Sequence, residues 1–226
     1  MRLQPSSPYS QRIEKIVFAA SFLLWPINSQ YILAKFLAFK QFYAHLLEYC
    51  QLNKPYVLGM NCSFYYFEGV AYAGLQEPHN ALNSFLVAYE IMKSGEGALS
   101  NDLFSYVDTN DDSTNITETE FLIKVMGIME QHNYSEQLVT LGLLALKDCD
   151  NKTLLPDVYN ILFKSELLTN RYQEALHTLL SNPVNDTRRN CLRELLSRLL
   201  ENNKREILVH LNYKDMEEYV NIVSSL

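Results

Sequence analysis

The stretch from Asp108 to Asp112 carries the residues best suited to hold a metal ion. Asp108, Asn110 and Asp112 alternate in the way that oxygen ligands do at the start of an EF-hand calcium loop. The pattern then fails, because Ser113 occupies the position of the required glycine and Thr119 that of the bidentate glutamate. We therefore interpret the stretch as a solvated acidic loop and predict no metal site.

Thiol and imidazole side chains can also bind metals or act as nucleophiles, but they are scattered along this chain. No two cysteines have the close spacing of a zinc site or a redox pair, and no two histidines are spaced to clamp a metal from one helix. We expect reduced core thiols of a cytosolic or nuclear protein, and histidines in turns or on the surface. The residues concerned are Cys50, Cys62, Cys149, Cys191, His45, His79, His132, His177 and His210.

Signatures of catalysis are missing from the sequence. It contains no phosphate-binding glycine loop, nucleophile elbow or His-Glu metalloprotease helix. The acidic residues fall mainly at expected helix starts and polar faces, where they interact favourably with helix dipoles. No residue is therefore nominated as catalytic or cofactor-binding. We predict that the chain is not an enzyme, needs no cofactor and takes no small-molecule substrate.

Aromatic side chains are the candidates for binding another protein. The chain has 15 tyrosines and 11 phenylalanines, and such residues are favoured in the cores of interfaces. Most of them recur at the spacing of a helix core, so packing is the principal interpretation. Tyr65, Tyr72 and Tyr106 follow that spacing least, and they are the candidate residues of a partner interface.

The charge pattern argues against polyanionic partners. The net charge is −7, and no run of Lys or Arg is long enough to form a phosphate-binding stripe. Arg188, Arg189, Arg193 and Arg198 lie on or near one expected helix, but Glu194 interrupts any patch of single sign. We predict a solvated polar face there, and no direct binding of nucleic acid or of an acidic membrane.

An apolar run from Ile16 to Ile27 follows the basic residues Arg12 and Lys15, as in a signal peptide. The run is too short to span a bilayer, and no small-residue cleavage site follows it. Because an aromatic-rich apolar pattern continues to Cys50, we predict a core helix and no transmembrane segment. A targeting signal, leading a secreted or membrane-anchored helical protein, is the alternative.

Helices are the elements that must position all of these residues. Apolar residues recur at helical spacing, whereas strand-like alternation is nearly absent, so we predict an all-α fold. A chain of 226 residues, 48% hydrophobic, can bury a substantial core. The expected helical segments are Tyr31 to Cys50, Cys62 to Ala73, Pro78 to Met92, Thr117 to Met129, Ser135 to Ala145, Pro156 to Leu168, Tyr172 to Leu179, Asp186 to Leu200 and Glu206 to Leu211, with a short helix around Leu99 to Val107.

The clearest helical hairpin lies between Cys62 and Met92. Gly74 can end its first helix, and Pro78 can open its second. Small residues at Gly69, Ala71 and Ala73 would let the two helices approach closely.

A connection rich in Gly, Ser, Asp and Asn, from Ser94 to Asn115, interrupts the helical pattern. After it, Thr117 and Glu120 have the spacing of a capping box. We therefore predict a first helical block at residues 1–107, an acidic polar loop at 108–117 and a second helical block at 118–226. The two blocks would belong to the same α-solenoid.

A turn followed by a helix restart recurs along the chain, which indicates a repeat. The intervals are unequal, and the residue signature of regular tetratricopeptide repeats is missing. We predict an irregular, tetratricopeptide-like α-solenoid of stacked helical hairpins, whose side surfaces bind partners. The four copies are His79-Asn80-Ala81-Leu82, Ser135-Glu136-Gln137-Leu138, Gln173-Glu174-Ala175-Leu176 and Arg205-Glu206-Ile207-Leu208.

Several segments in order resemble one known family. They are CSFYYFEGVAYAGLQEPHNALNSFLVA, FLIKVMGIMEQHNYSEQLVTLGLLAL, VYNILFKSELLTNRYQEALHTLLSNP and RRNCLRELLSRLLEN. The most telling stretch runs from Tyr172-Gln173-Glu174-Ala175 through Asn182-Pro183 to Arg188-Arg189 and Cys191-Leu192-Arg193. This order resembles the helical region of the large scaffold nucleoporin of the Y-shaped outer-ring complex of the nuclear pore, the one-hundred-and-sixty-kilodalton type.

The resemblance implies a structural role. Members of that family combine an amino-terminal β-propeller with a long helical stack, hold together the outer rings of the pore, and support messenger RNA export and protein traffic. It implies other nuclear pore scaffold subunits as partners and a location at the nuclear envelope. The chain has no propeller-like strands and stops after Tyr219-Val220, so the resemblance is to a helical-region fragment. A generic tetratricopeptide-like adaptor that grips a peptide or protein partner is the alternative.

Overall fold

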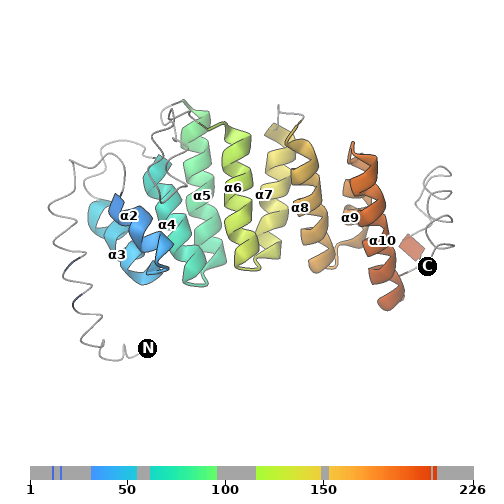
Figure 1. The fold of residues 1–226 in the computed structure, drawn as a ribbon, viewed down its shortest axis with the longest axis horizontal. Helices are drawn as coiled ribbons and strands as arrows, with labels where there is room; N and C mark the ends of the chain where they lie inside the picture. The colour runs from blue at the N-terminus through green and yellow to red at the C-terminus, as the bar shows by residue number, and fades with distance from the viewer. Residues whose placement is uncertain are drawn as a thin grey trace. The chain divides into compact units, whose positions relative to one another are not determined.

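A computed structural model of the chain describes Arg12, Ile16, and residues 32–54, 62–95, 116–148, 153–204 and 206–207. These residues form helices joined by turns, and no strand occurs among them (Figure 1). The predicted all-α class is therefore confirmed for the described ranges. Outside these ranges lie the expected helix around residues 99–107, residues 108–115 of the acidic loop and, apart from the exposed Ile16, the apolar run at 16–27.

The chain divides into two compact units, Met1–Phe121 and Leu122–Leu226. The first contains α2 (Ile32–Phe39), α3 (Tyr43–Asn53), α4 (Cys62–Gly74), α5 (Pro78–Lys93) and the start of α6 (Glu118–Gln131). The second contains the rest of α6, then α7 (Ser135–Asp148), α8 (Leu155–Leu168), α9 (Tyr172–Ser181) and α10 (Asn185–Glu201). The division predicted from sequence, with its loop at 108–117, stays a prediction.

The single helix expected from Tyr31 to Cys50 is wrong. Helix α2 ends at Phe39, and Gln41 adopts a left-handed backbone with φ 58° before α3 begins at Tyr43. Phe39, expected at core spacing, is 58% exposed. Periodicity could not reveal this break, because apolar residues continue across it and no glycine or proline marks it.

One turn geometry recurs throughout the described part of the chain. In each copy, a residue with φ between 54° and 63° donates its N–H to the carbonyl three residues earlier. The next residue donates its N–H to the carbonyl five residues earlier, which completes a Schellman motif. After Gln41, Gln76, Asn133 and Asn170, a new helix begins two residues later. The left-handed residues are Gln41, Gln76, Asn133, Asn170 and Asn203.

These turns show a regular period that the sequence alone conceals. The left-handed residues of these five turns are separated by 35, 57, 37 and 33 residues; Gly95, which follows α5 with φ 74°, is not one of them. Three of the intervals lie near the tetratricopeptide period of about 34 residues. The interval of 57 spans the polar connection from Ser94 to Asn115. The irregularity expected from sequence therefore comes mainly from one long connection between otherwise similar hairpins.

The first unit is held by close packing of α4 on α5. A Cβ built on Gly69 would lie only 2.6 Å from Cε1 of Phe85, a side chain that is 1% exposed. The Tyr66 ring contacts the rings of Phe67, Phe85 and Phe121 at centroid distances of 5.3, 6.1 and 6.3 Å. The predicted close approach of the two helices is confirmed at Gly69, where only a hydrogen atom fits.

The expected capping box opens α6. The Thr117 N–H donates to Glu120 Oε2 at 2.8 Å, and the Glu120 N–H donates to Thr117 Oγ1 at 3.3 Å. Each side chain thus satisfies a backbone donor that the helix leaves unpaired at its start. Across the residues that the structure describes, no helix has the length and apolar composition needed to cross a bilayer.

Candidate interaction surfaces

Two of the three predicted interface tyrosines share one face of α4. Tyr65 and Tyr72 are seven residues apart, which is close to two helical turns. Both side chains are half-buried, so each presents part of its ring to solvent. Tyr106 lies outside the described residues. We call the surface formed by Tyr65, Tyr72 and the Lys54–Glu68 ion pair the α4 strip.

That ion pair joins three consecutive helices of the first unit. Glu68 is buried on α4, and its Oε2 accepts a hydrogen bond from the Ser84 hydroxyl of α5 at 3.0 Å. Its Oε1 lies 3.5 Å from Nζ of Lys54, which follows α3 and has a side chain 59% exposed. A buried carboxylate needs such partners, because an unpaired charge in the interior is strongly destabilising. The strip therefore has a fixed anionic group beneath an accessible cation.

The phenol of Tyr72 stays neutral at physiological pH. Burial raises the pKa of Tyr72, and the nearby carboxylates of Glu68 and Glu77 raise it further. A neutral phenol both donates and accepts hydrogen bonds. The α4 strip therefore offers aromatic area, hydroxyl groups and one exposed ammonium group, which suits a mixed polar and apolar protein contact. Sequence reasoning missed Glu68, although a lone acidic residue in an apolar helix was the available signal.

The described cysteines Cys50, Cys62 and Cys191 are buried, as predicted for core thiols, and Cys149 lies outside the described residues. The Cys62 thiol donates to the Ala88 carbonyl at 3.0 Å, and burial raises its pKa to about 12. Burial also raises the pKa of Cys50, with Glu68 adding to the effect, and raises that of Cys191 to about 11. Thiols are nucleophilic only as thiolates, so these three buried thiols are poor nucleophiles in the folded chain.

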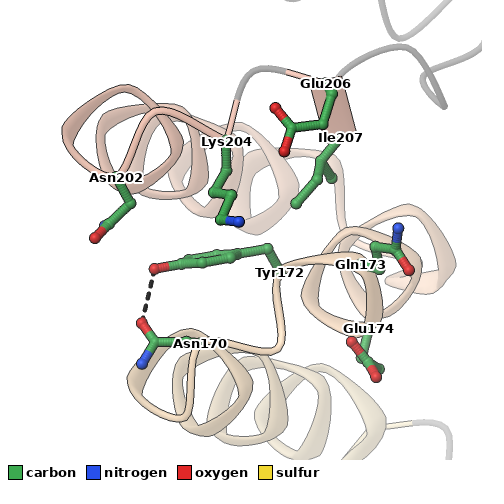
Figure 2. A pocket seen from close by; sticks show the side chains of 8 residues that line it. All are labelled: Asn170, Tyr172, Gln173, Glu174, Asn202, Lys204, Glu206 and Ile207. Carbon is green, nitrogen blue, oxygen red and sulfur yellow. Dashed lines mark hydrogen bonds between the residues drawn. The ribbon is translucent and has the colours of Figure 1, made fainter.

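The second unit has a polar groove beside the turn that follows α8 and the turn that follows α10 (Figure 2). We call it the turn groove. It has a volume of about 560 Å³ and is bordered by the turn between α8 and α9 and by the turn after α10. The lining residues are Asn170, Tyr172, Gln173, Glu174, Asn202, Lys204, Glu206 and Ile207.

Hydrogen-bonding groups dominate the turn groove. The Tyr172 hydroxyl donates to Asn170 Oδ1 at 2.7 Å, and Lys204 points toward the Tyr172 ring (Figure 2). Glu174 and Glu206 supply two carboxylates against the single ammonium of Lys204. The lining contains no thiol, hydroxyl–histidine pair or set of metal ligands. It can hydrogen-bond a polar chain such as a peptide.

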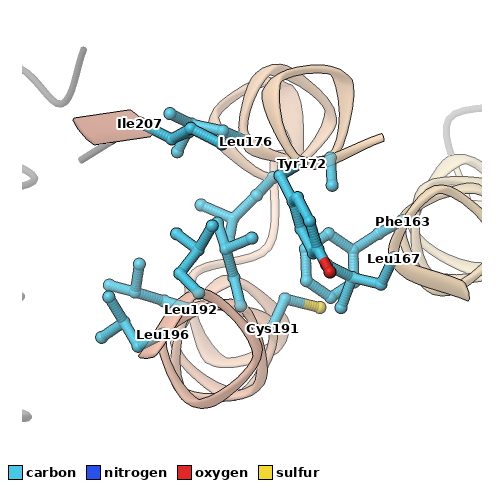
Figure 3. Packing of buried hydrophobic residues seen from close by; sticks show 12 residues of the cluster. Phe163, Leu167, Tyr172, Leu176, Cys191, Leu192, Leu196 and Ile207 are labelled. Atoms are coloured by element: carbon cyan, nitrogen blue, oxygen red, sulfur yellow. The ribbon is translucent and has the colours of Figure 1, made fainter. Parts of the chain in front are cut away.

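The groove is fixed by the core beneath it. Figure 3 shows apolar side chains from α8, α9 and α10 converging, with Tyr172 and Ile207 belonging both to this core and to the groove lining. Leucines at 192, 195, 196 and 199 form the stripe of an amphipathic helix on α10. The groove lining is thus tied through Tyr172 and Ile207 to the packing of α8, α9 and α10. Sequence reasoning identified Tyr172-Gln173-Glu174 as a family marker but did not place it in a groove.

Polar residues elsewhere in the second unit behave as surface groups. Arg189, Arg193 and Arg198 of α10 are exposed, as is Glu194 between them, in keeping with the predicted solvated face. Arg188 departs from that prediction, because it is half-buried and its guanidinium donates to the Asn182 carbonyl at 3.1 Å. The Arg171 guanidinium lies 2.6 Å from the Glu136 carboxylate, but both side chains are largely exposed, so this ion pair contributes little. Among the described residues, no cluster of His, Cys, Asp and Glu side chains is positioned to hold a metal ion.

The fold and these surfaces define a class: helical hairpins with a tetratricopeptide-like period and exposed polar and aromatic surfaces, as in repeat proteins that bind other proteins. Residues 25–225 match the family described as the NUP160/120 middle TPR, and the chain belongs to this family. The chain is also similar to a Drosophila melanogaster protein, the Nuclear pore complex protein Nup160 homolog, with 26% identity over 131 residues. That match covers 57% of this chain and 9% of the relative. The resemblance found in the sequence is thereby confirmed at the level of the family.

Proposed function

We propose that this chain is a structural scaffold component of the nuclear pore complex, in its outer-ring Y complex, and that it works by binding other proteins. The observation that carries the proposal is the family match over residues 25–225. The recurring hairpin turn supports it, because stacked hairpins provide long side surfaces for partners. In this role the chain has no catalytic residues, and its partners are other pore scaffold subunits.

Such a scaffold would act at the nuclear envelope and support messenger RNA export and protein import. The similar Drosophila melanogaster protein, whose name places it in the nuclear pore complex, supports this location. The chain spans about a tenth of the length of that relative, so the activities of the whole relative are carried to it only as part of this proposal.

The α4 strip is the partner surface that we favour within this role. Tyr65 and Tyr72 offer aromatic area on one helix face, and Lys54, paired with Glu68 and close enough to influence Tyr72, adds an exposed charge. Aromatic side chains contribute disproportionately to binding energy when they are desolvated at the centre of an interface. Tyr106 remains a third candidate for the same role.

A generic tetratricopeptide-like adaptor is the second candidate function. The turn groove favours it, because a polar groove of about 560 Å³ lined by amides and carboxylates can hydrogen-bond an extended peptide. The two functions predict different partners. A scaffold binds folded pore subunits over a large surface, whereas an adaptor binds short segments of many proteins.

Affinity purification of the tagged endogenous protein distinguishes them. We expect the wild-type chain to recover pore scaffold subunits, and a Tyr65→Ser, Tyr72→Ser double variant to recover fewer of them. Tyr159→Ser, which changes a half-buried tyrosine on α8, is the matched control and should recover the wild-type set. Recovery of unrelated proteins that share a short peptide motif, with loss on Glu174→Gln, would instead establish the adaptor.

A further inference from the structure

Glu166 of α8 is an acidic residue enclosed by the core of the second unit. It is 2% exposed, and its neighbours in sequence include the buried Phe163 and Leu167. Its Oε2 atom is buried and has no hydrogen-bond partner in the structure. The carboxyl group therefore sits in an environment that disfavours its charged form.

The groups around Glu166 do not compensate its carboxylate for the loss of hydration on burial. On α9, the Thr178 side chain hydrogen-bonds the carboxyl, and Glu174, one turn earlier, adds a negative charge nearby. The turn residue Arg171 attracts the carboxylate, but its guanidinium is already 2.6 Å from Glu136 at the start of α7. The unfavourable burial outweighs the attraction, and it raises the pKa of Glu166 to about 7.

Among the described residues, α7 and α10 also pack on α8. On α7, Glu136 and Lys147 are exposed and Asp148 is half-buried at the helix end. On α10, the charged side chains are exposed except for the half-buried Arg188, whose guanidinium donates to the Asn182 carbonyl at 3.1 Å. Both helices thus turn their charged groups largely to solvent.

We propose that Glu166 is a proton-sensitive element of the α8–α9 hairpin, which is held most tightly when this carboxyl is neutral and loosens when it ionises. Loosening of the hairpin would alter the turn groove. The Glu166 carbonyl accepts the Arg171 N–H at 2.8 Å and so closes the turn that carries the lining residues Asn170 and Tyr172. This device adds regulation to the second unit and does not depend on which partner the chain binds.

The direction of the effect follows from linkage. The pKa of Glu166 is raised in the folded chain above its ordinary value of 4.5. An acid of this kind contributes its full stability at low pH, and the contribution is lost as the pH rises toward and through 7. With a pKa of 4.5 in the unfolded chain and about 7 in the folded chain, raising the pH from 5 to 8 increases the unfolding equilibrium constant by about 70-fold.

The test compares urea unfolding of the full chain at pH 5 and pH 8 for wild type, Glu166→Gln and Glu194→Gln. Glutamine keeps the shape of Glu166 and removes its ionisation. The ratio of the unfolding constants at pH 8 and pH 5 should therefore be about 70-fold smaller in Glu166→Gln than in wild type. Glu194 is exposed on α10, and its variant should behave as wild type. Equal pH dependence in wild type and Glu166→Gln would overturn the proposal.

A second measurement holds even if Glu166→Gln does not fold. Carbon-13 NMR of the side-chain carboxyl follows the titration of Glu166 in the wild-type chain directly. A midpoint near 7, with amide exchange in α8 and α9 that rises above the intrinsic pH effect, supports the proposal. A midpoint near 4.5 contradicts it.

Discussion

Replacing Gly69 by alanine tests the close packing of α4 on α5 most sharply. The added Cβ would lie 2.6 Å from Cε1 and 2.7 Å from Cδ1 of Phe85. Phe85 is 1% exposed and also contacts the Tyr66 ring, so it has little room to retreat. Forcing one more carbon into such a core typically costs about 1–3 kcal/mol.

The same substitution at Gly127 isolates the backbone part of the effect. Gly127 lies inside α6, and a Cβ built on it meets nothing within 4 Å. Alanine is favoured over glycine in a helix interior by about 1 kcal/mol, so Gly127→Ala should stabilise the chain by about 0.5–1 kcal/mol. At Gly69 the steric cost exceeds this gain, and we expect a net loss of about 1–2 kcal/mol.

Urea unfolding followed by circular dichroism gives the two free energies. The expected result is opposite signs for the two variants, with Gly69→Ala less stable and Gly127→Ala more stable than wild type. Combining Gly69→Ala with Phe85→Leu should recover part of the loss, because a shorter side chain removes the overlap. If Gly69→Ala stabilised the chain as much as Gly127→Ala, the close packing of α4 on α5 would be refuted.

Three further outcomes follow from single contacts. Asn170→Ala should be less stable than Asn170→Gly by about 1 kcal/mol in urea unfolding, because both remove the side chain but only glycine adopts φ 60° freely; equal stabilities would contradict the turn geometry. Ser84→Ala should cost about 1–3 kcal/mol by thermal unfolding, since it removes a hydrogen bond from the buried Glu68, and a neutral effect would show that this bond is unimportant. In a Cys149→Ser background, a thiol reagent at pH 8 should modify the remaining cysteines only after denaturant is added, because they are buried; rapid labelling of the native chain would contradict this.

Much of the fold was accessible from sequence because its helix ends carry strong local signals. Gly74 and Pro78 bracket the α4–α5 turn, and the predicted and observed helices there differ by a residue at most. The break between α2 and α3 was missed because Gln41, rather than glycine or asparagine, takes the left-handed position. The regular period became visible only once the left-handed residues of the five turns were placed, since Asn and Gln, which occupy these positions, also occur at many other positions of the chain.

The candidate surfaces were predicted less completely. Tyr65 and Tyr72 were found from their departure from core spacing, but Tyr106 lies outside the described residues. Glu68 and Glu166 were not flagged, because a glutamate within a helix normally marks its solvent face. Their burial depends on neighbouring helices, and helical periodicity carries no information on which helix packs against which.

The location of the protein in cells shows whether this chain is a nuclear pore scaffold component. The measurement is fluorescence imaging of the endogenous protein carrying a tag, with a known pore protein imaged in the same cells. If the chain is a component of the pore scaffold, a punctate signal at the nuclear rim will coincide with the pore marker. A diffuse cytoplasmic signal would leave the helical fold intact and contradict the proposed function.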